Sequence, residues 1–404
     1  MSGQISPQNV VGRDRLIEQI WKKLESRSLR LTAERRIGKT TVMKKMLAEP
    51  RPGTAVLFLD LEKADSPRRF TEVLLQEVKP LLSTKQKAAS WFEELLTDIG
   101  GTEIGGVIKI PEGDRAAWKG PLEKVFDRVC SQNPDTRIVL LFDELPYMLQ
   151  KIAAYEKQAG AAHHAALEML DTLRAMRHRH ANLRMIFAGS VGLHHVLTEL
   201  RQTEFASQPV NDMPPVEVGA LALPDAVTLS KRLLETEGVQ VAPADRELLP
   251  HELAVLTDRV PFYLERVVAR LAELEGPVSV QDARQIVRQH LTDDNDVWEM
   301  EHFRGRLKIY YHGSSGDANG RPILNASLAS AILDLLAIAP TPQTIDEVWA
   351  AMKAQLALDN RDQIIQLLKS LAQDHYLTSD PDKRYSFRFP LIRQWWVLAQ
   401  GIRS

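Results

Sequence analysis

The stretch LTAERRIGKTTVMKKM, residues 31–46, constrains this chain more than any other, because Gly-Lys-Thr-Thr joins a short apolar run to a helical pattern. A phosphate-binding loop needs a strand before it, inward-turned backbone N–H groups, and a lysine at the start of a helix. Gly38 supplies the backbone freedom, Lys39 the charge, and Thr40 a hydroxyl for Mg²⁺. Ala33 replaces the first glycine of the G-x-x-x-x-G-K-[ST] pattern. The alternative reading is a basic strand-to-helix turn.

A second signal lies in RIVLLFDE, residues 137–144, where an apolar run ends in Asp143 and Glu144. An NTPase holds Mg²⁺ with an Asp at such a strand end and polarises water with the following Glu. An acidic pair there can also serve only as the N-cap of the next helix. Because both signals occur in the order that a nucleotide site requires, we predict that the two segments form one site.

A third strand end, in LRMIFAGS (183–190), closes on Ser190. Its hydroxyl is placed to sense a γ-phosphate or to orient water, and the simpler alternative is a turn cap. Ligands of open α/β sheets bind at the carboxyl ends of the strands, where all three segments end. Ser190 is therefore a candidate for the same site.

The chain alternates short apolar runs with helical patterns up to about residue 215, which is typical of a parallel α/β domain. Strands are expected at 29–33, 54–62, 137–144 and 183–190. The domains that we predict are an ATPase core at 1–220 with an insertion at about 84–120, an α-helical lid at 221–311, a Gly- and Ser-rich linker at 312–325, and a winged helix at 326–404.

Composition narrows the class of protein. The 404 residues are 44% hydrophobic and 26% charged, as in packed globular domains. With 51 basic and 53 acidic side chains, the chain has no overall charge that would attract nucleic acid or anionic lipid. No apolar run reaches the roughly 18 residues of a membrane span, and the start has no secretory h-region. With the lone Cys130, these features predict a cytoplasmic protein without membrane contact.

The expected winged helix consists of three helical patterns and a two-stranded ribbon that turns at Asp380-Pro381-Asp382. Its net charge is zero, and its third helix offers few cations for reading base edges. The ribbon, or wing, is better supplied, with basic residues at Lys383, Arg384, Arg388 and Arg393. Weak, sequence-independent DNA contact through the wing and protein docking both remain open. For HFRGRLKIYYHG (302–313) we favour helix packing over a nucleic-acid surface.

Several segments together resemble the archaeal-type ATPase group of AAA+-related proteins. They are VVGRDRLIEQIWKKL before the loop, ERRIGKTT within it, LLFDELPYML, FAGSVGL and TDRVPFYLERV. This group is related to the signal-transduction ATPases with numerous domains (STAND), and the resemblance spans about residues 9 to 396. It implies a P-loop AAA+-like core with a parallel sheet, a helical lid and a winged helix.

The resemblance also implies roles for individual residues. Asp143 and Thr40 would hold Mg²⁺, Glu144 would be the water-activating base, and Lys39 and Ser190 would complete the catalytic set. Pro261 would contact the nucleotide from the lid, although Arg259 stands where relatives carry glycine. Three residues would lie near the adenine, Val11, Gly12 and Arg13, and six would wrap the phosphates, Arg36, Ile37, Gly38, Lys39, Thr40 and Thr41.

These observations predict an ATP-binding, ATP-hydrolysing switch or motor of the AAA+/STAND type, with ATP and Mg²⁺ as cofactors. It would couple its nucleotide state to a protein or DNA partner through the winged helix, and nucleotide-dependent self-association is compatible with this. The alternative is a nucleotide-regulated adaptor or DNA-binding module that does not hydrolyse ATP. Glu144 separates the two, because a base at that position favours turnover.

Overall fold

The computed structural model describes most of the chain, in two compact units that meet between Val218 and Gly219 and are described separately. The described residues are 9–83, 92–94, 96–97, 102–104, 107–109, 118–158, 164–189, 192–201, 208–316 and 322–402.

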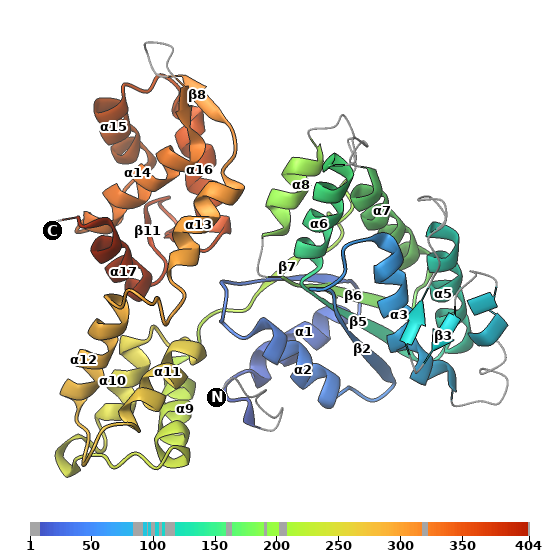
Figure 1. Ribbon diagram of the computed structural model, residues 1–404, viewed down its shortest axis with the longest axis horizontal. Helices are drawn as coiled ribbons and strands as arrows, with labels where there is room; N and C mark the ends of the chain where they lie inside the picture. The colour runs from blue at the N-terminus through green and yellow to red at the C-terminus, as the bar shows by residue number, and fades with distance from the viewer. Residues whose placement is uncertain are drawn as a thin grey trace. The chain divides into compact units, whose positions relative to one another are not determined.

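The first unit contains a five-stranded parallel sheet in the order β2-β5-β6-β1-β7 (Figure 1). Its strands are β1 (Leu29–Thr32), β2 (Thr54–Asp60), β5 (Arg137–Asp143), β6 (Leu183–Phe187) and β7 (Pro215–Glu217). The central strand β5 is buried from Ile138 to Asp143, as its continuous apolar run predicts for a strand covered on both faces. The predicted α/β core is confirmed, and β7 is a strand that its three residues did not reveal.

Helices cover both faces of this sheet (Figure 1). One face carries α1 (Asp14–Leu24) and α2 (Lys39–Ala48). The opposite layer consists of α3 (Pro67–Ser83), α5 (Lys119–Gln132), α6 (Leu145–Gln158), α7 (His164–Arg179) and α8 (Leu193–Arg201). In the region of the predicted insertion, β3 (Thr102–Ile104) and β4 (Val107–Lys109) pair antiparallel, and most of 84–117 lies outside the described residues.

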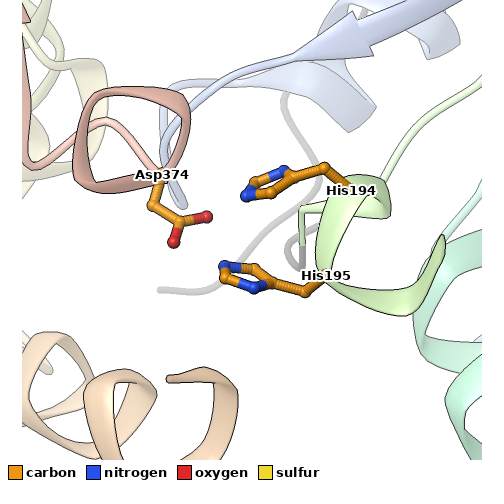
Figure 2. A group of neighbouring side chains, drawn as sticks. All are labelled: His194, His195 and Asp374. Atoms are coloured by element: carbon orange, nitrogen blue, oxygen red, sulfur yellow. The ribbon is translucent and has the colours of Figure 1, made fainter. Parts of the chain in front are cut away.

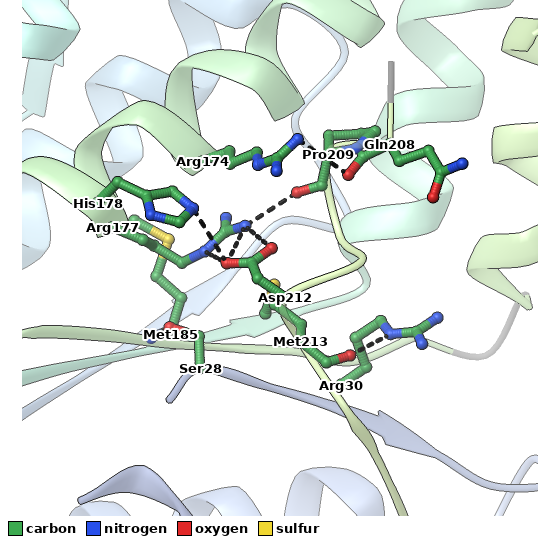
Figure 3. Close-up of polar contacts among 10 residues, drawn as sticks. All are labelled: Ser28, Arg30, Arg174, Arg177, His178, Met185, Gln208, Pro209, Asp212 and Met213. Atoms are coloured by element: carbon green, nitrogen blue, oxygen red, sulfur yellow. Dashed lines mark hydrogen bonds and ion pairs between the residues drawn. The ribbon is translucent and has the colours of Figure 1, made fainter. Parts of the chain in front are cut away.

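The chain before β7 is fastened by one buried arginine (Figure 3). Arg177 of α7 donates to the carbonyl oxygen of Pro209 at 2.9 Å and to Asp212 Oδ1 at 3.0 Å. Arg30 of β1 adds a bond of 2.9 Å from its Nε to the carbonyl oxygen of Met213. A buried guanidinium with several acceptors is costly to disturb, so these contacts hold β7 against β1 despite its short length.

The second unit begins with helices, and their interpretation as a lid stays a prediction. They are α9 (Leu223–Thr236), the 3₁₀ turn η2 (Pro243–Asp245), α10 (Leu249–Leu256), α11 (Pro261–Leu271), α12 (Val280–Leu291) and α13 (Glu301–Tyr310). Local sequence explains where α12 begins. The Ser279 hydroxyl accepts from the Asp282 N–H, and the Asp282 carboxylate accepts from the Ser279 N–H, which together form a capping box. On α13, Phe303 and Leu307 are buried, which confirms the packing interpretation of this basic segment.

The last part of the chain begins with two short strands, β8 (Ser314–Gly316) and β9 (Pro322–Leu324), which pair antiparallel where a linker was predicted. The elements that follow are α14 (Asn325–Ile338), α15 (Ile345–Leu356), α16 (Arg361–Gln373), β10 (Leu377–Ser379), β11 (Tyr385–Phe387) and α17 (Pro390–Gln400). Three helices and an antiparallel ribbon thus occur in the predicted order, and the winged-helix interpretation stays a prediction.

A tight turn between α10 and α11 connects distant parts of this second unit. Asp258 and Arg259 both have left-handed backbones, with φ of 49° and 60°. The Arg259 carbonyl accepts a bond from the N–H of Leu221 at 3.1 Å, and Asp258 Oδ2 accepts one from the N–H of Leu391 at 2.7 Å. The turn therefore ties the start of α9 and the first turn of α17 to one place.

Candidate functional site

The loop between β1 and α2 has the backbone that a phosphate loop requires. Gly38 has φ of 104°, a region that side chains with a Cβ rarely adopt, so this position needs glycine. Lys39 folds back across the loop and donates from Nζ to the carbonyl oxygens of Ala33 at 3.0 Å and Glu34 at 3.1 Å. Ala33 is not among the described residues with a positive φ, so an alanine fits at the first position of the pattern. Arg36 also takes a left-handed φ, of 66°.

Thr40 at the start of α2 meets Asp143 at the end of β5. The Thr40 hydroxyl donates to Asp143 Oδ2 at 2.6 Å. Strand pairing explains this placement, because β1, which leads into α2, and β5 both pair parallel with β6 and so end at the same edge of the sheet. The two separate sequence signals are thereby brought into contact, as predicted.

Asp143 is buried, and its Oδ1 has no hydrogen-bond partner among the described residues. Burial raises the pKa of this carboxyl above its usual value, and the nearby carboxylates of Glu144 and Asp60 raise it further, against the Thr40 hydrogen bond and the Lys39 charge. A buried carboxylate oxygen without a partner, beside a hydroxyl, fits the oxygen ligands that Mg²⁺ prefers. Asp60 belongs to this acidic edge, and sequence analysis missed it.

Glu144 lies directly after β5 in a left-handed backbone, with φ of 57°. The turn is held to the end of β6, because Leu145 N–H donates to the Ala188 carbonyl at 3.1 Å and Ala188 N–H donates to the Phe142 carbonyl at 2.9 Å. A left-handed glutamate at a strand end is uncommon and is a feature of functional sites.

Gly189 makes this arrangement possible. A Cβ added there would lie 2.6 Å from Pro146 Cδ and 3.5 Å from Glu144 Oε2. The glycine of FAGS thus allows the β6 end to pass close to the glutamate turn. Sequence analysis singled out the neighbouring Ser190 and missed Gly189, whose signal is a small residue at a strand end.

Arg13 reaches the phosphate loop from the segment before α1. Its guanidinium donates to the carbonyl oxygen of Ile37 at 2.7 Å, and both residues are buried. Gly12 precedes it with a left-handed φ of 71°, and Val11 is half-buried beside it. The residues that the resemblance assigns to the adenine region are therefore placed next to the loop.

The roles predicted for Ser190 and Pro261 stay predictions. Ser190 lies outside the described residues, so its role stays a prediction. Pro261 is the first residue of α11, in the second unit, and the residue two positions before it, Arg259, has the left-handed backbone that glycine adopts most easily. Thr41 lies in α2, and its side chain would be 3.8 Å from a Cβ at Gly38.

Downstream of β6, α8 presents two neighbouring imidazoles, His194 and His195 (Figure 2). Their ring centroids are 4.2 Å apart and the rings are tilted by 36°. We assign them no chemistry.

The cations predicted for the wing differ in their surroundings. Arg393 donates from Nε to the Ala337 carbonyl at 2.7 Å and from Nη2 to the Ala339 carbonyl at 3.0 Å, so it caps the end of α14. Arg388 lies 3.0 Å from His375 Nδ1 and packs over the Phe389 ring. Lys383 and Arg384 are exposed on the ribbon turn. The basic surface of the ribbon is therefore smaller than the sequence suggests.

Comparisons with known proteins agree with this geometry. Residues 23–197 match the family described as AAA domain. The fold is similar to that of the Walker-type ATPase PABY2304 of Pyrococcus abyssi, with a TM-score of 0.60 at 14% identity over 96% of each chain. No curated protein matches by sequence.

Two further structures align with lower scores. The ADPNP–ADP complex of the ORC2 protein of Aeropyrum pernix has a TM-score of 0.39 at 13% identity, over 98% of this chain and 96% of that one. The RuvB Holliday junction branch migration motor of Thermotoga maritima has a TM-score of 0.37 at 12% identity, over 93% and 92%. At these scores they carry no argument.

A separate finding concerns membranes: none of the helices in the described residues has the length and apolar character to span one. The phosphate loop, the paired Thr40 and Asp143, the family match and the shared fold lead to one conclusion. Residues 23–197 match the AAA domain family and have the fold and the phosphate loop of a P-loop ATPase.

Proposed function

We propose that this chain is a nucleotide-driven switch that binds and hydrolyses Mg²⁺-ATP and passes its nucleotide state to a protein partner. The observation that carries the proposal is the 2.6 Å bond between Thr40 and Asp143, beside Asp143 Oδ1, which has no hydrogen-bond partner among the described residues. It supports one metal–phosphate centre built from two distant segments.

Within this centre the chain's own groups have distinct tasks. The ammonium of Lys39 neutralises phosphate charge, and the N–H groups around Gly38 orient the phosphates at the start of α2. Thr40 and Asp143 hold Mg²⁺, which when bound offsets charge that develops on the phosphates. Glu144 accepts a proton from the attacking water and so directs it at the terminal phosphorus.

The alternative is a chain that holds ATP as a structural signal and does not turn it over. Glu144 favours hydrolysis, because its special backbone and the close fit of Gly189 keep a carboxylate beside Asp143. A residue kept only as a helix cap would not require the strained turn.

The experiment compares the wild-type protein with Glu144→Gln and Lys39→Ala, measuring nucleotide binding by calorimetry and phosphate release at multiple turnover. We expect Glu144→Gln to bind ATP with near wild-type affinity while hydrolysis falls at least a hundredfold. Lys39→Ala should lose about 1.5–3 kcal/mol of binding.

Undiminished turnover in Glu144→Gln would remove the glutamate from its role as base. Tight binding without turnover in the wild type would instead establish the adaptor alternative. Unchanged affinity in Lys39→Ala would overturn the site assignment itself.

The finer parts of the proposal concern partners. The C-terminal helices and ribbon, interpreted as a winged helix, would serve as the docking platform, with weak DNA contact limited to the ribbon turn. Cytoplasmic location, nucleotide-dependent self-association and the assignment of Pro261 to the nucleotide remain predictions. Capture of partners by Glu144→Gln from native cells, compared with Lys39→Ala, tests the switch, because only the first should hold the ATP state.

A further inference from the structure

Arg13 is buried, with 5% of its surface exposed, yet it lies in the segment before α1 and not in the phosphate loop. Its guanidinium donates from Nη2 to the carbonyl oxygen of Ile37, 2.7 Å away and 24 residues further along the chain. Ile37 is itself 1% exposed. A charge-assisted bond in such a dry environment is strong and directional, so it fixes the orientation of the Ile37 carbonyl.

That carbonyl belongs to the peptide that enters Gly38. A trans peptide is planar, so its C=O and N–H groups point to opposite sides. When Arg13 holds the Ile37 carbonyl on one side, the N–H of Gly38 is directed to the other. Gly38 has φ of 104° and, as a glycine, offers little resistance to rotation of its neighbouring peptides. The direction of this N–H therefore depends on a partner outside the loop.

The next residue forms a second attachment to α2. Asp14 Oδ1 lies 2.8 Å from Lys45 Nζ, near the end of the helix. The Lys45 side chain is 10% exposed, whereas that of Asp14 is 75% exposed. Asp14 thus joins α1 to α2 without contacting the loop. It provides a matched comparison for Arg13, since both residues fasten the same segment and only one of them touches a loop peptide.

We propose that Arg13 is a positioning residue for phosphate recognition, which orients the Gly38 N–H by holding the Ile37 carbonyl. The inference rests on the proposed function. The resemblance places Arg13 near the adenine, whereas here Arg13 serves the recognition of the phosphates. It requires no contact between Arg13 and the nucleotide. Binding of phosphate chains should therefore depend on Arg13 even when no adenine is present.

The experiment uses inorganic tripolyphosphate as a probe that carries the phosphates and lacks the base. Its affinity and that of ATP are measured by calorimetry for the wild-type protein, Arg13→Ala, Arg13→Lys, Asp14→Ala and Lys39→Ala. We expect Arg13→Ala to weaken both probes by a similar factor of at least ten. Asp14→Ala should change either affinity by less than twofold. Arg13→Lys, which keeps a charged donor of nearly the same reach, should recover part of the loss.

Loss of ATP affinity in Arg13→Ala with unchanged tripolyphosphate affinity would overturn the proposal and return Arg13 to the adenine. Equal losses in Arg13→Ala and Asp14→Ala would also overturn it, because fastening α1 would then be the whole effect. If Arg13→Ala does not fold, Arg13→Lys decides: a partial loss shared by both probes supports the proposal, and a loss confined to ATP refutes it. Failure of the wild type to bind either probe would refute the proposed function as well, whereas loss in Lys39→Ala alone would refute only this inference.

Discussion

Thr40 and Asp143 are joined by a hydrogen bond of 2.6 Å although 103 residues separate them in the chain. This bond leaves Asp143 Oδ1 as the buried carboxylate oxygen that a divalent cation would satisfy. The hydroxyl and the carboxylate thus form one pair of metal ligands, and a substitution of either residue should weaken the metal binding of both.

Thr40→Ala should therefore reduce Mg²⁺-dependent hydrolysis much more than nucleotide binding in EDTA. Losing a hydrogen bond to a charged group costs about 1.5–3 kcal/mol, or roughly a factor of 10 to 100 in rate or metal affinity. Thr40→Ser keeps the hydroxyl and should stay within a few-fold of wild type. Measurement of kcat against Mg²⁺ concentration checks this, and similar losses in both variants would show that the threonine methyl, not the hydroxyl, matters.

Gly189→Ala should destabilise the protein and slow hydrolysis, because the new Cβ would stand 2.6 Å from Pro146 Cδ. Forcing an extra methyl into a packed site costs about 1–3 kcal/mol. Gly120→Ala is a matched control in α5, where a Cβ meets nothing within 4 Å. There the same change should stabilise by about 0.5–1 kcal/mol. Thermal unfolding of the two variants should shift in opposite directions, and a common shift would contradict the close approach at Gly189.

Asp258 should make stability depend on pH. Burial raises the pKa of this carboxyl to about 6, against the N–H bond from Leu391 and the charge of Arg259. The folded state then holds a proton that the unfolded state releases from about pH 4 upward. The stability that this protonated carboxyl contributes to the folded state is fully present below about pH 4, and it is lost as the pH rises through 6. Over this window the change is on the order of 2–3 kcal/mol.

The check is the difference in melting temperature between Asp258→Asn and wild type across pH 4 to 8. As the pH rises, the melting temperature of Asp258→Asn should increase relative to that of the wild type. Asparagine keeps an acceptor for the Leu391 N–H and tolerates the left-handed backbone. Asp282→Asn should give a nearly flat difference over the same range, because hydrogen bonds from Ser279 lower the pKa of Asp282 and this carboxylate is ionised in both the folded and the unfolded state above about pH 4. A flat difference for Asp258→Asn would mean that the carboxylate stays ionised.

Duplex DNA binding, if the ribbon provides it, should be weak and independent of sequence. Two exposed cations, Lys383 and Arg384, would give a slope of about −2 for log affinity against log salt, at about −0.9 for each phosphate neutralised. The double alanine variant at these positions should abolish it and leave ATP binding unchanged. Lys231→Ala/Arg232→Ala removes an equal pair from α9 and should have little effect. A steep slope, or nanomolar affinity at physiological salt, would contradict this.

The sequence was most informative where chemistry and local pattern coincide. Apolar runs revealed β1, β2, β5 and β6. The Gly-Lys-Thr pattern at the start of α2 identified Lys39 and Thr40, and the acidic end of β5 identified Asp143. Periodicity also gave the helical character of the second unit. These features depend on near neighbours in the chain, which a single sequence displays.

Features that depend on distant partners could not be found this way. The strand β7 has three residues and is held by Arg177 and Arg30 through the chain before it. Arg393 was expected on the wing because a charge pattern does not distinguish a free cation from one that caps α14. The bond from Arg13 to Ile37, likewise, joins two segments whose spacing has no recognisable pattern.

The register of β2 on β5 has a consequence for how this protein tolerates insertions and deletions. Seven consecutive pairs bring Asp60 and Asp143 level at the edge of the sheet, and β5 is buried along almost its whole length. Side chains alternate between the two faces of a sheet, so the deletion of one residue between Ile138 and Phe142 could be accommodated in two ways, and both would be damaging. Either Asp143 is drawn into the sheet, away from Thr40, or every apolar residue before it turns to the opposite face. Changes of length should thus be excluded from this strand and confined to loops such as the one that carries β3 and β4.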